Sequence, residues 1–238
     1  MSVLKSIREA KSANKKFLAI LIDPDTDFTN VKAVLENAKK VHVDIIFVGG
    51  SLLYQGRIDE CIDFIRKYSD LPITIFPGSE IQMSNKADAI LLLSLISGRN
   101  ADLLIGKHVV AAPFLKKMNL EVIPTGYMLV DGGKTTTASY ISQTVPIPSD
   151  KPGIAMATAM AGEYLGLQLI YMDAGSGAHN QVPPDMIQIV RKSISIPIIV
   201  GGGIKSKDQL VAAWNAGADV VVVGNILENN PDELLGLR

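Results

Sequence analysis

The chain has 238 residues, of which 47% are hydrophobic, and its 23 basic and 24 acidic side chains leave a formal net charge of −1. This length fits one large domain or two small ones, with enough apolar residues for a sizeable core. The balanced charge, without a long block of one sign, argues against a generic nucleic-acid or anionic-membrane surface. A local basic patch stays open.

The single cysteine, Cys61, excludes an intramolecular disulfide and favours a reducing compartment. Because Cys61 lies in a helix-like stretch, we expect a small core residue rather than a nucleophile. The segment 1–16 is polar and helix-like, and the apolar run 17–22 is too short for a signal core or a membrane span. We therefore expect a soluble, cytoplasmic protein.

Short runs rich in Ile, Val and Leu recur along the chain, each followed by a helix-like segment. Their nearly continuous hydrophobicity predicts strands buried on both faces, as in a parallel sheet. Segments such as 30–40 and 209–218 carry apolar residues at helical spacing, and Ser206 followed by Gln209 predicts a capping box. The predicted strands lie at 17–22, 44–49, 73–76, 89–94, 121–130, 169–173, 196–202 and 219–224.

Strand-plus-helix units repeated in this way predict a (β/α)₈ TIM barrel that forms a single domain over residues 1–238. A doubly wound open sheet is the main alternative, but it normally has its glycine fingerprint after the first strand. Here acidic residues follow the first predicted strand, and the glycines crowd behind the last three. No linker or low-complexity segment indicates a second domain.

Three aspartates, Asp23, Asp25 and Asp27, follow the first predicted strand in "LIDPDTD". The carboxyl end of a barrel strand lies on the catalytic rim, and Mg²⁺ typically takes about one or two carboxylates and fills its shell with water and substrate phosphate. We expect Asp23 to be the Mg²⁺ ligand, because Asp27 fits a helix cap and Asp25 a turn. Ser51, after the next strand in "VGGS", would add a hydroxyl at the same rim.

Glycine-rich turns follow the last three predicted strands: "AGSGA" (174–178), "GGGI" (201–204) and "GN" (224–225). Barrel enzymes commonly bind phosphate at the loops after strands seven and eight, where glycine lets backbone N–H groups approach an oxyanion. One such turn would indicate only a tight connection, whereas three in succession predict a phosphate site. The layout suits two phosphorylated substrates, a monophosphate at the glycine turns and a Mg²⁺-bound diphosphate at the aspartate.

Other sequence features carry less weight. The segment "DGGKTTT" (131–137) resembles a P-loop, but Met128 occupies the position of its earlier glycine, and "GSGAHN" lacks the third glycine of a dinucleotide fingerprint. Trp214 lies at core spacing and is expected to pack. The histidines have no partner spacing that predicts metal binding or nucleophilic catalysis; they are His42, His108 and His179.

The motifs "LIDPD", "VGGS", "FPG", "YMDAGSGA", "VGGGI" and "VGN", in order from Leu21 to Asn225, resemble those of geranylgeranylglyceryl phosphate synthases and their heptaprenylglyceryl phosphate synthase relatives. Residues 135–148 are similar to the branch of the family found in both bacteria and archaea. The resemblance implies a Mg²⁺-dependent prenyltransferase that joins sn-glycerol 1-phosphate to a prenyl diphosphate, here geranylgeranyl diphosphate or a related long chain. The product contains the first ether bond of archaeal-type lipids. A homo-oligomer, dimer or hexamer, is also implied.

By this resemblance, Asp23 and Ser51 bind Mg²⁺, and Asp173 orients the attacking hydroxyl and takes its proton. Many relatives have Glu in place of Asp173, and some archaeal members have Lys in place of Leu21. The residues expected to hold glycerol phosphate are Tyr171, Met172, Asp173, Ala174, Gly175, Ser176, Gly177, Gly202, Gly203, Gly224 and Asn225.

A prenyl tail needs a long apolar groove, and we expect Tyr127, after Gly126, to line or gate it. An ordinary core position is the alternative for this tyrosine. Tyr140 is an expected interface aromatic, and transient contact with a membrane surface fits a lipid substrate.

Two other functions share part of this pattern. A phosphosugar isomerase or a thiamine phosphate synthase-like barrel would have the late glycine turns without a long apolar groove. A non-catalytic barrel that binds flavin or phosphate would use only the last two turns. It would leave Asp23 and Asp173 without a role.

Overall fold

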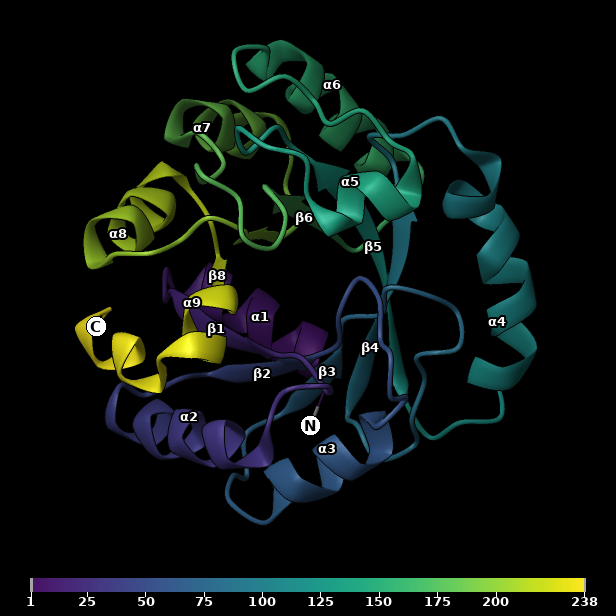
Figure 1. The fold of residues 1–238 in the computed structure, drawn as a ribbon. Coiled ribbons are helices and arrows are strands. Elements are labelled where there is room, and N and C mark those ends of the chain that lie inside the picture. Colours follow the sequence, from purple (N-terminus) through teal and green to yellow (C-terminus); the bar gives the residue numbers. More distant parts are fainter. Residues whose placement is uncertain (1, 238) are drawn as a thin grey trace.

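The computed structural model describes residues 2–237, and its eight strands form a closed barrel of parallel neighbours (Figure 1). The strands follow chain order around the barrel, and β8 pairs with β1 to close it. This arrangement confirms the predicted TIM barrel, with a strand in each predicted segment. The strands are β1 (Phe17–Ile22), β2 (Ile45–Val48), β3 (Ile73–Ile75), β4 (Ala89–Leu95), β5 (Glu121–Leu129), β6 (Leu169–Asp173), β7 (Ile198–Gly201) and β8 (Val220–Val223).

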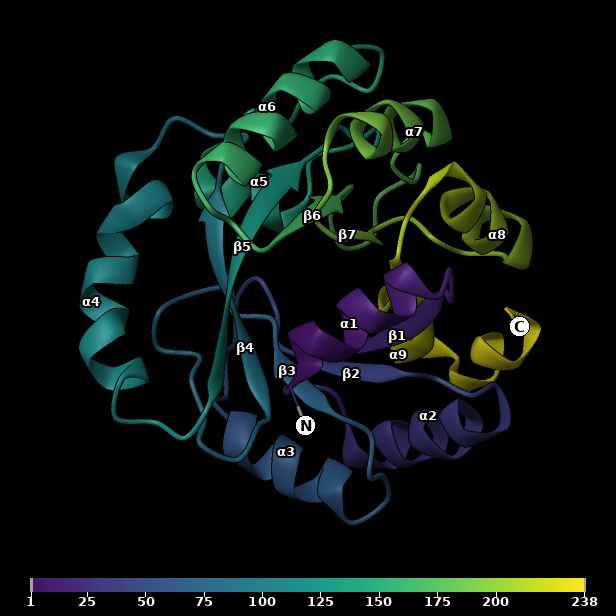
Figure 2. The same ribbon diagram turned by 180° about the vertical axis from the view of Figure 1, so that it is seen from behind.

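Helices surround the barrel, and α1 lies across its N-terminal opening, as Figure 2 shows. Val3 and Ile7 of α1 pack with the side chains that fill the barrel interior. The helices are α1 (Val3–Ser12), α2 (Phe28–Lys40), α3 (Ile58–Arg66), the π-helix η1 (Asp102–Gly106), α4 (Lys107–Leu115), α5 (Thr137–Ser142), α6 (Pro152–Tyr164), α7 (Pro184–Ser193), α8 (Lys207–Ala216), α9 (Asn225–Asn229) and the 3₁₀-helix η2 (Pro231–Gly236).

The connection between β3 and β4 departs from the predicted strand-plus-helix pattern. Residues 76–88 form turns and bends instead of a helix, and the expectation of a helix after every strand is wrong here. Pro77 biases Phe76 away from helical backbone angles, Gly78 lowers helix propensity at the next position, and the segment is short. The outer side of the barrel at β3 therefore has no covering helix of its own.

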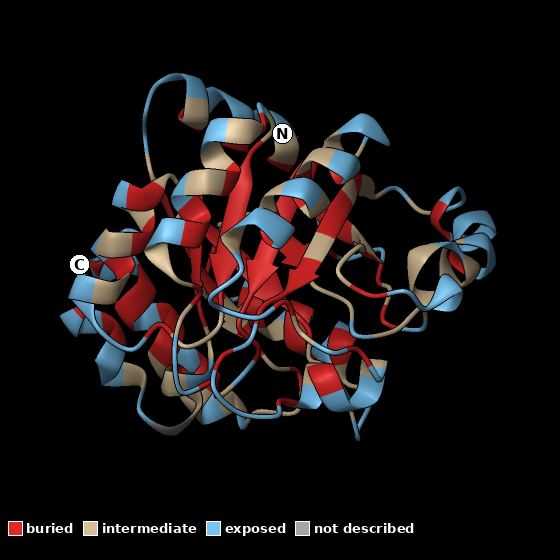
Figure 3. Cartoon of the chain, turned by 90° about the horizontal axis from the view of Figure 1, so that it is seen from above, coloured by how far each residue is buried: buried red, intermediate tan, exposed pale blue. Residues whose placement is uncertain are grey.

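Strand side chains alternate between the barrel interior and the layer beneath the helices, so the core has two parts. On β6, Ile170 and Met172 pack in the outer layer, whereas Leu169 and Tyr171 pack in the interior. Figure 3 shows that the strands are buried along most of their length. The same alternation directs Asp173 into the barrel at the carboxyl end of β6.

Side-chain caps begin several helices. Asp27 caps α2 by accepting a hydrogen bond from the Thr29 backbone N–H, as expected. Ser206 caps α8 by accepting from Gln209 N, but the Gln209 side chain accepts from Lys205 N at 2.7 Å and not from Ser206 N. The reciprocal half of the predicted capping box is therefore wrong.

Two residues noted in the sequence have packing roles. Cys61 is fully buried in α3, and burial raises the pKa of its thiol to about 12, which confirms a core position. Trp214 packs against the outer core and donates from Nε1 to the Phe17 carbonyl at 3.2 Å.

None of the helices within residues 2–237 combines the length and apolar character needed to cross a membrane.

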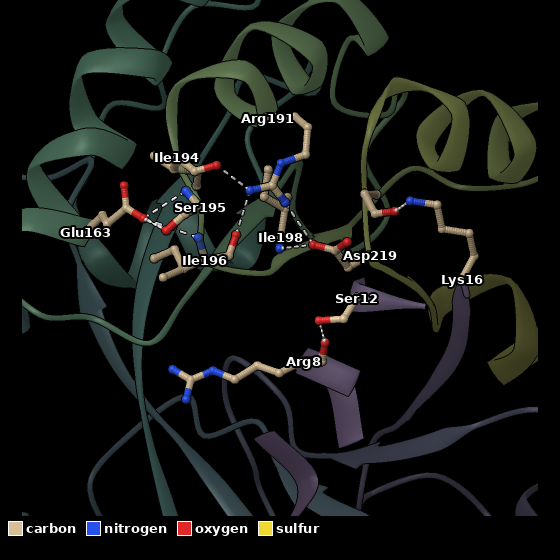
Figure 4. A network of polar contacts seen from close by, with 11 residues as sticks. Arg8, Ser12, Lys16, Glu163, Arg191, Ile194, Ser195, Ile196, Ile198 and Asp219 are labelled. Atoms are coloured by element: carbon tan, nitrogen blue, oxygen red, sulfur yellow. Dashed lines mark hydrogen bonds and ion pairs between the residues drawn. The ribbon is translucent and has the colours of Figure 1, made fainter. Parts of the chain in front are cut away.

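An ion pair between the buried Asp219 and the partly buried Arg191 ties together the amino ends of β7 and β8 (Figure 4). Asp219 accepts from Arg191 Nη1 at 2.9 Å and from Ile198 N at 2.8 Å. Arg191 Nη2 also donates to the carbonyl groups of Ile194 and Ile196. The pair therefore holds α7 against two strands at the end of the barrel opposite the catalytic rim.

We predict that Asp219→Ala lowers the free energy of unfolding by about 3 kcal/mol, because it leaves a partly buried guanidinium and a buried backbone N–H without their partner. Urea unfolding followed by the fluorescence of Trp214 measures the change. Asp150→Ala is the matched control, since its side chain is 73% exposed. A loss no larger than that of the control would contradict the structural role assigned to the pair.

Candidate active site

A cavity of about 420 Å³ opens at the carboxyl ends of the barrel strands. Its lining is polar at the loops after β6, β7 and β8, and apolar along β4 and the inner face of α4. The apolar part extends beside the connection that lacks a helix, so the missing helix opens room for a long hydrophobic group. Its side chains include Met83, Leu91, Leu93, Leu103, Ala111 and Leu115.

Asp173 lies where the polar and apolar parts meet, and its side chain is almost fully buried. Oδ1 accepts from Gly175 N at 2.7 Å, and Oδ2 accepts from the Tyr127 hydroxyl at 2.6 Å. Burial raises the pKa of the Asp173 carboxyl, while these two hydrogen bonds oppose part of the rise. The carboxylate is thus fixed in position and more basic than an exposed aspartate.

Three aromatic rings form the floor beneath Asp173. Phe76 and Tyr171 stack with ring centroids 4.8 Å apart, and Tyr127 packs at 5.9 and 5.7 Å from them. Burial raises the pKa of both tyrosine hydroxyls well above the ordinary value, so both are neutral at physiological pH. Tyr127 is therefore at once a lining residue and the hydrogen-bond partner of the carboxylate.

The glycine-rich turns come together around Asp173. Gly202 has a φ of +78°, and a Cβ there would lie 2.6 Å from Asp173 Oδ1 and from Gly175 N. Only glycine permits this backbone conformation and this close approach. Together the turns form a backbone-lined concavity with few side chains, the kind of site that accepts a phosphate.

The structure brings together most of the residues expected to hold glycerol phosphate, but it directs three elsewhere. Met172 and Ala174 pack in the outer hydrophobic layer, because alternate residues of an extended segment face opposite sides. Gly175 supports Asp173 through its N–H. The expected residues that line the cavity are Tyr171, Asp173, Ser176, Gly177, Gly202, Gly203, Gly224 and Asn225.

Gly126 lies on the opposite face of β5 from the cavity. A Cβ at Gly126 would lie 2.8 Å from the Cδ1 atoms of Ile96 and Ile170, so its small size serves packing beneath α6. Tyr140 is 75% exposed on α5, away from the cavity.

The acidic residues after β1 have separate roles. Asp23 lines the cavity, and its Oδ1 accepts from Asp25 N at 2.8 Å. A Cβ built on Gly50 would lie 2.7 Å from the other carboxylate oxygen, Asp23 Oδ2. Ser51 follows Gly50 in the chain and lines the cavity at the same rim. Burial raises the pKa of the Asp23 carboxyl. Asp25 instead accepts from the backbone N–H groups of Tyr54 and Gln55, which joins the loops after β1 and β2.

No cluster of three or more His, Cys, Asp or Glu side chains within residues 2–237 is placed to hold a metal ion. Asp23 and Ser51 therefore offer a pair of oxygen donors and not a closed metal cage.

Several cavity residues have no role that the sequence predicts. His108 lines the apolar part, with Nε2 3.1 Å from Ser94 Oγ. Lys205 lines the polar part directly after "GGGI", and its place next to a glycine turn was the only signal in the sequence. Phe76 lies in the quoted motif "FPG", but its stacking on Tyr171 depends on strands distant in the chain.

Residues 10–236 match the PcrB family, almost the whole chain. The chain belongs to the PcrB family. It is 53% identical to the geranylgeranylglyceryl phosphate synthase of Spirosoma linguale, over 96% of this chain and 92% of that protein. It is 40% identical to the synthase of the same name from Korarchaeum cryptofilum, over 96% and 94% of the two chains. These relatives confirm the resemblance seen in the motifs.

Solved structures agree with this membership. The crystal structure of (S)-3-O-geranylgeranylglyceryl phosphate synthase from Thermoplasma acidophilum, in complex with its substrate sn-glycerol-1-phosphate, matches with a TM-score of 0.93. The two chains are 35% identical, and the match covers 100% of this chain and 96% of that one. A thiamine phosphate pyrophosphorylase from Pyrococcus furiosus matches over 94% of this chain and 96% of its own, with a TM-score of 0.55 and 15% identity. That likeness shows the fold alone.

The buried carboxylate of this PcrB-family chain leads to a stability prediction. A pKa raised in the folded state means that ionised Asp173 costs folding free energy at neutral and alkaline pH, and that the cost falls as pH drops toward that pKa. Asp173→Asn keeps an oxygen acceptor for Gly175 N and removes the charge. We expect its Tm at about pH 8 to exceed that of the wild type by roughly 2 °C or more, with a smaller difference at about pH 5.5.

Thermal unfolding followed by circular dichroism at the two pH values measures this effect. Asp150→Asn, at an exposed position, is the control for the general loss of a negative charge. A variant with a lower Tm than the wild type at both pH values would show that the ionised carboxylate stabilises the fold.

Proposed function

We propose that the chain is a prenyltransferase that joins sn-glycerol 1-phosphate to geranylgeranyl diphosphate, or to a related long prenyl diphosphate, and releases diphosphate. The observation that carries the proposal is the position of Asp173, a buried carboxylate between a backbone-lined anion site and a long apolar cavity. The names of the family relatives support it, as does the solved relative with its bound substrate. The product is the first ether of an archaeal-type lipid.

In this reaction the glycine turns bind the phosphate and Asp173 receives a hydroxyl of the glycerol. The hydroxyl oxygen forms a bond to C1 of the prenyl chain, and the bond from C1 to the diphosphate oxygen breaks. The hydroxyl proton passes to Asp173, whose raised pKa suits a general base. A fixed negative charge beside an anion site is thus explained, because the carboxylate faces the hydroxyl and not the phosphate.

The aromatic floor suits the charge that develops on the prenyl group. As the allylic C–O bond lengthens, positive charge grows at C1, and Phe76, Tyr127 and Tyr171 all line the cavity in which we place this atom. Aromatic faces attract cations, more strongly when water is excluded. The apolar cavity along β4 and α4 then holds the tail.

Asp23 and Ser51 are the residues that would hold Mg²⁺. The Asp23 Oδ2 atom faces Gly50 at the cavity wall beside Ser51, and a carboxylate with a hydroxyl is an oxygen donor set of the kind Mg²⁺ takes. When bound, the ion would neutralise charge on the departing diphosphate. The hydrogen bond from Asp25 N fixes Asp23 Oδ1. The other oxygen, Oδ2, lies beside Gly50 at the rim and would be the ligand of the ion.

Other phosphate-handling barrels fit less well. A phosphosugar isomerase needs no apolar extension of the cavity, and a flavin-binding barrel leaves Asp23 and Asp173 unused. Together with this function we propose homo-oligomeric assembly and a cytoplasmic location. We also propose transient contact with a membrane surface, from which the protein would take up the prenyl substrate.

To test the proposal directly, the protein is incubated with Mg²⁺, labelled sn-glycerol 1-phosphate and a series of prenyl diphosphates of increasing length, and the labelled ether product is measured. We expect prenylglyceryl phosphate from the wild type, with kcat reduced roughly 100-fold or more in Asp173→Asn and Asp23→Asn, since each removes a group required in the transition state. Chelation of Mg²⁺ is expected to abolish turnover. Absence of ether with every chain length would remove the proposal and favour the phosphosugar barrels.

The hydrogen bond between Tyr127 and Asp173 should also set the pH dependence of activity. The Tyr127 hydroxyl stabilises the ionised form of Asp173 and so lowers its pKa. Tyr127→Phe removes this bond, the pKa of Asp173 rises further, and the carboxylate becomes protonated at a higher pH. We therefore expect the acid limb of the kcat/KM profile to move to higher pH. Tyr164→Phe, an exposed residue on α6, is the control, and an unmoved acid limb would exclude Asp173 as the titrating base.

A further inference from the structure

The segment 131–137, whose "DGGKTTT" sequence fails as a P-loop, packs directly on the glycine loop after β6. Asn180 N donates to the Gly132 carbonyl at 3.0 Å. A Cβ at Gly132 would lie 2.6 Å from Ala178 Cβ, and one at Gly175 would lie 2.6 Å from Thr136 Oγ1. We call residues 131–137 the strap. It is fixed to the phosphate loop near both of its ends.

The far end of the strap is also held by α5. Thr136 caps this helix, and its side chain and that of Ser139 exchange hydrogen bonds with each other's backbone N–H groups. At the near end, Asp131 Oδ1 accepts from Gly133 N at 2.9 Å, and Gly133 has a φ of +84°. The chain therefore turns sharply directly before Lys134, between two anchored ends.

This turn brings the Lys134 ammonium to the edge of the phosphate site. A Cβ at Gly177 would lie 3.3 Å from Lys134 Nζ and 3.7 Å from Asn225 Oδ1. Gly177 and Asn225 both line the polar part of the cavity. Lys134 forms no ion pair with any carboxylate of the described residues. Lys205, the cation that lines this rim, donates to the His179 carbonyl at 3.3 Å.

We propose that Lys134 is a charged ligand of the substrate phosphate, with its ammonium closing the backbone-lined site from the side of the strap. This inference rests on the proposed function. Glycine turns supply neutral N–H donors, whereas a phosphate monoester carries close to two negative charges near neutral pH. A lysine with no competing carboxylate supplies positive charge at the site and makes it selective for dianions over neutral polyols.

The test measures sn-glycerol 1-phosphate binding by calorimetry, without prenyl substrate, for wild type, Lys134→Met, Lys134→Arg and the control Lys116→Met. Lys116 is exposed at the end of α4, away from the polar part of the cavity. We expect Lys134→Met to weaken binding of this ligand and of inorganic phosphate roughly 10- to 100-fold, as for loss of a hydrogen bond to a charged group. Lys134→Arg should stay within a few-fold of wild type, and Lys116→Met should be unchanged.

Two further readouts separate ligand binding from a packing role. In Lys134→Met, the KM for glycerol phosphate should rise while the KM for prenyl diphosphate and the Tm stay constant, and the salt dependence of phosphate binding should become shallower. Wild-type affinity in Lys134→Met, or a lowered Tm with an unchanged salt dependence, would overturn the proposal. If the wild type binds glycerol phosphate but forms no ether, the proposed function fails, and the binding data still decide the role of Lys134.

Discussion

The arrangement of the active site depends on the burial of one carboxylate, that of Asp173. One of its oxygens holds the loop after β6 through Gly175 N, and the other holds β5 through the Tyr127 hydroxyl. The loop after β7 must then pass so close to Oδ1 that Gly202 cannot carry a side chain. Gly202 is thus required by the carboxylate itself, and the buried charge of Asp173 and the glycine turn that begins at Gly175 lie next to each other in the chain.

Burial of this carboxylate has opposite effects on stability and reactivity. Water would solvate an exposed aspartate and keep its pKa low, whereas the interior raises the pKa and makes the group a better proton acceptor. The two hydrogen bonds limit that rise and hold the base where the hydroxyl of a bound substrate would lie. A site of this kind gives up folding free energy for function, in the manner expected of active sites in general.

The sequence predicted the barrel well because continuous apolar runs have one common explanation, a parallel sheet covered on both faces. Asp23 and Asp173 were expected at the rim because each ends such a run. Met172 and Gly126 face outward because side chains alternate along a strand. A motif that is treated as a run of consecutive residues does not show which of them face the cavity. The missing helix after β3 and the place of Lys134 could not be predicted in this way. Both depend on how segments that are distant in the chain pack together, and a local sequence pattern carries no information about such packing.

The polar and apolar parts of the cavity are formed by different kinds of atoms. This difference affects which cavity residues can be exchanged among members of the family. The polar part, where we propose that phosphate binds, consists mainly of backbone in glycine conformations that few other residues adopt, so most substitutions there disturb the loops themselves. The apolar part consists of side chains, among them Leu91, Leu103 and Leu115, on a strand, a π-helix and an ordinary helix. Exchange of these side chains changes the depth of the cavity and leaves the backbone in place. The side chains that would hold the prenyl tail can therefore change with its length while the proposed phosphate site and Asp173 stay the same.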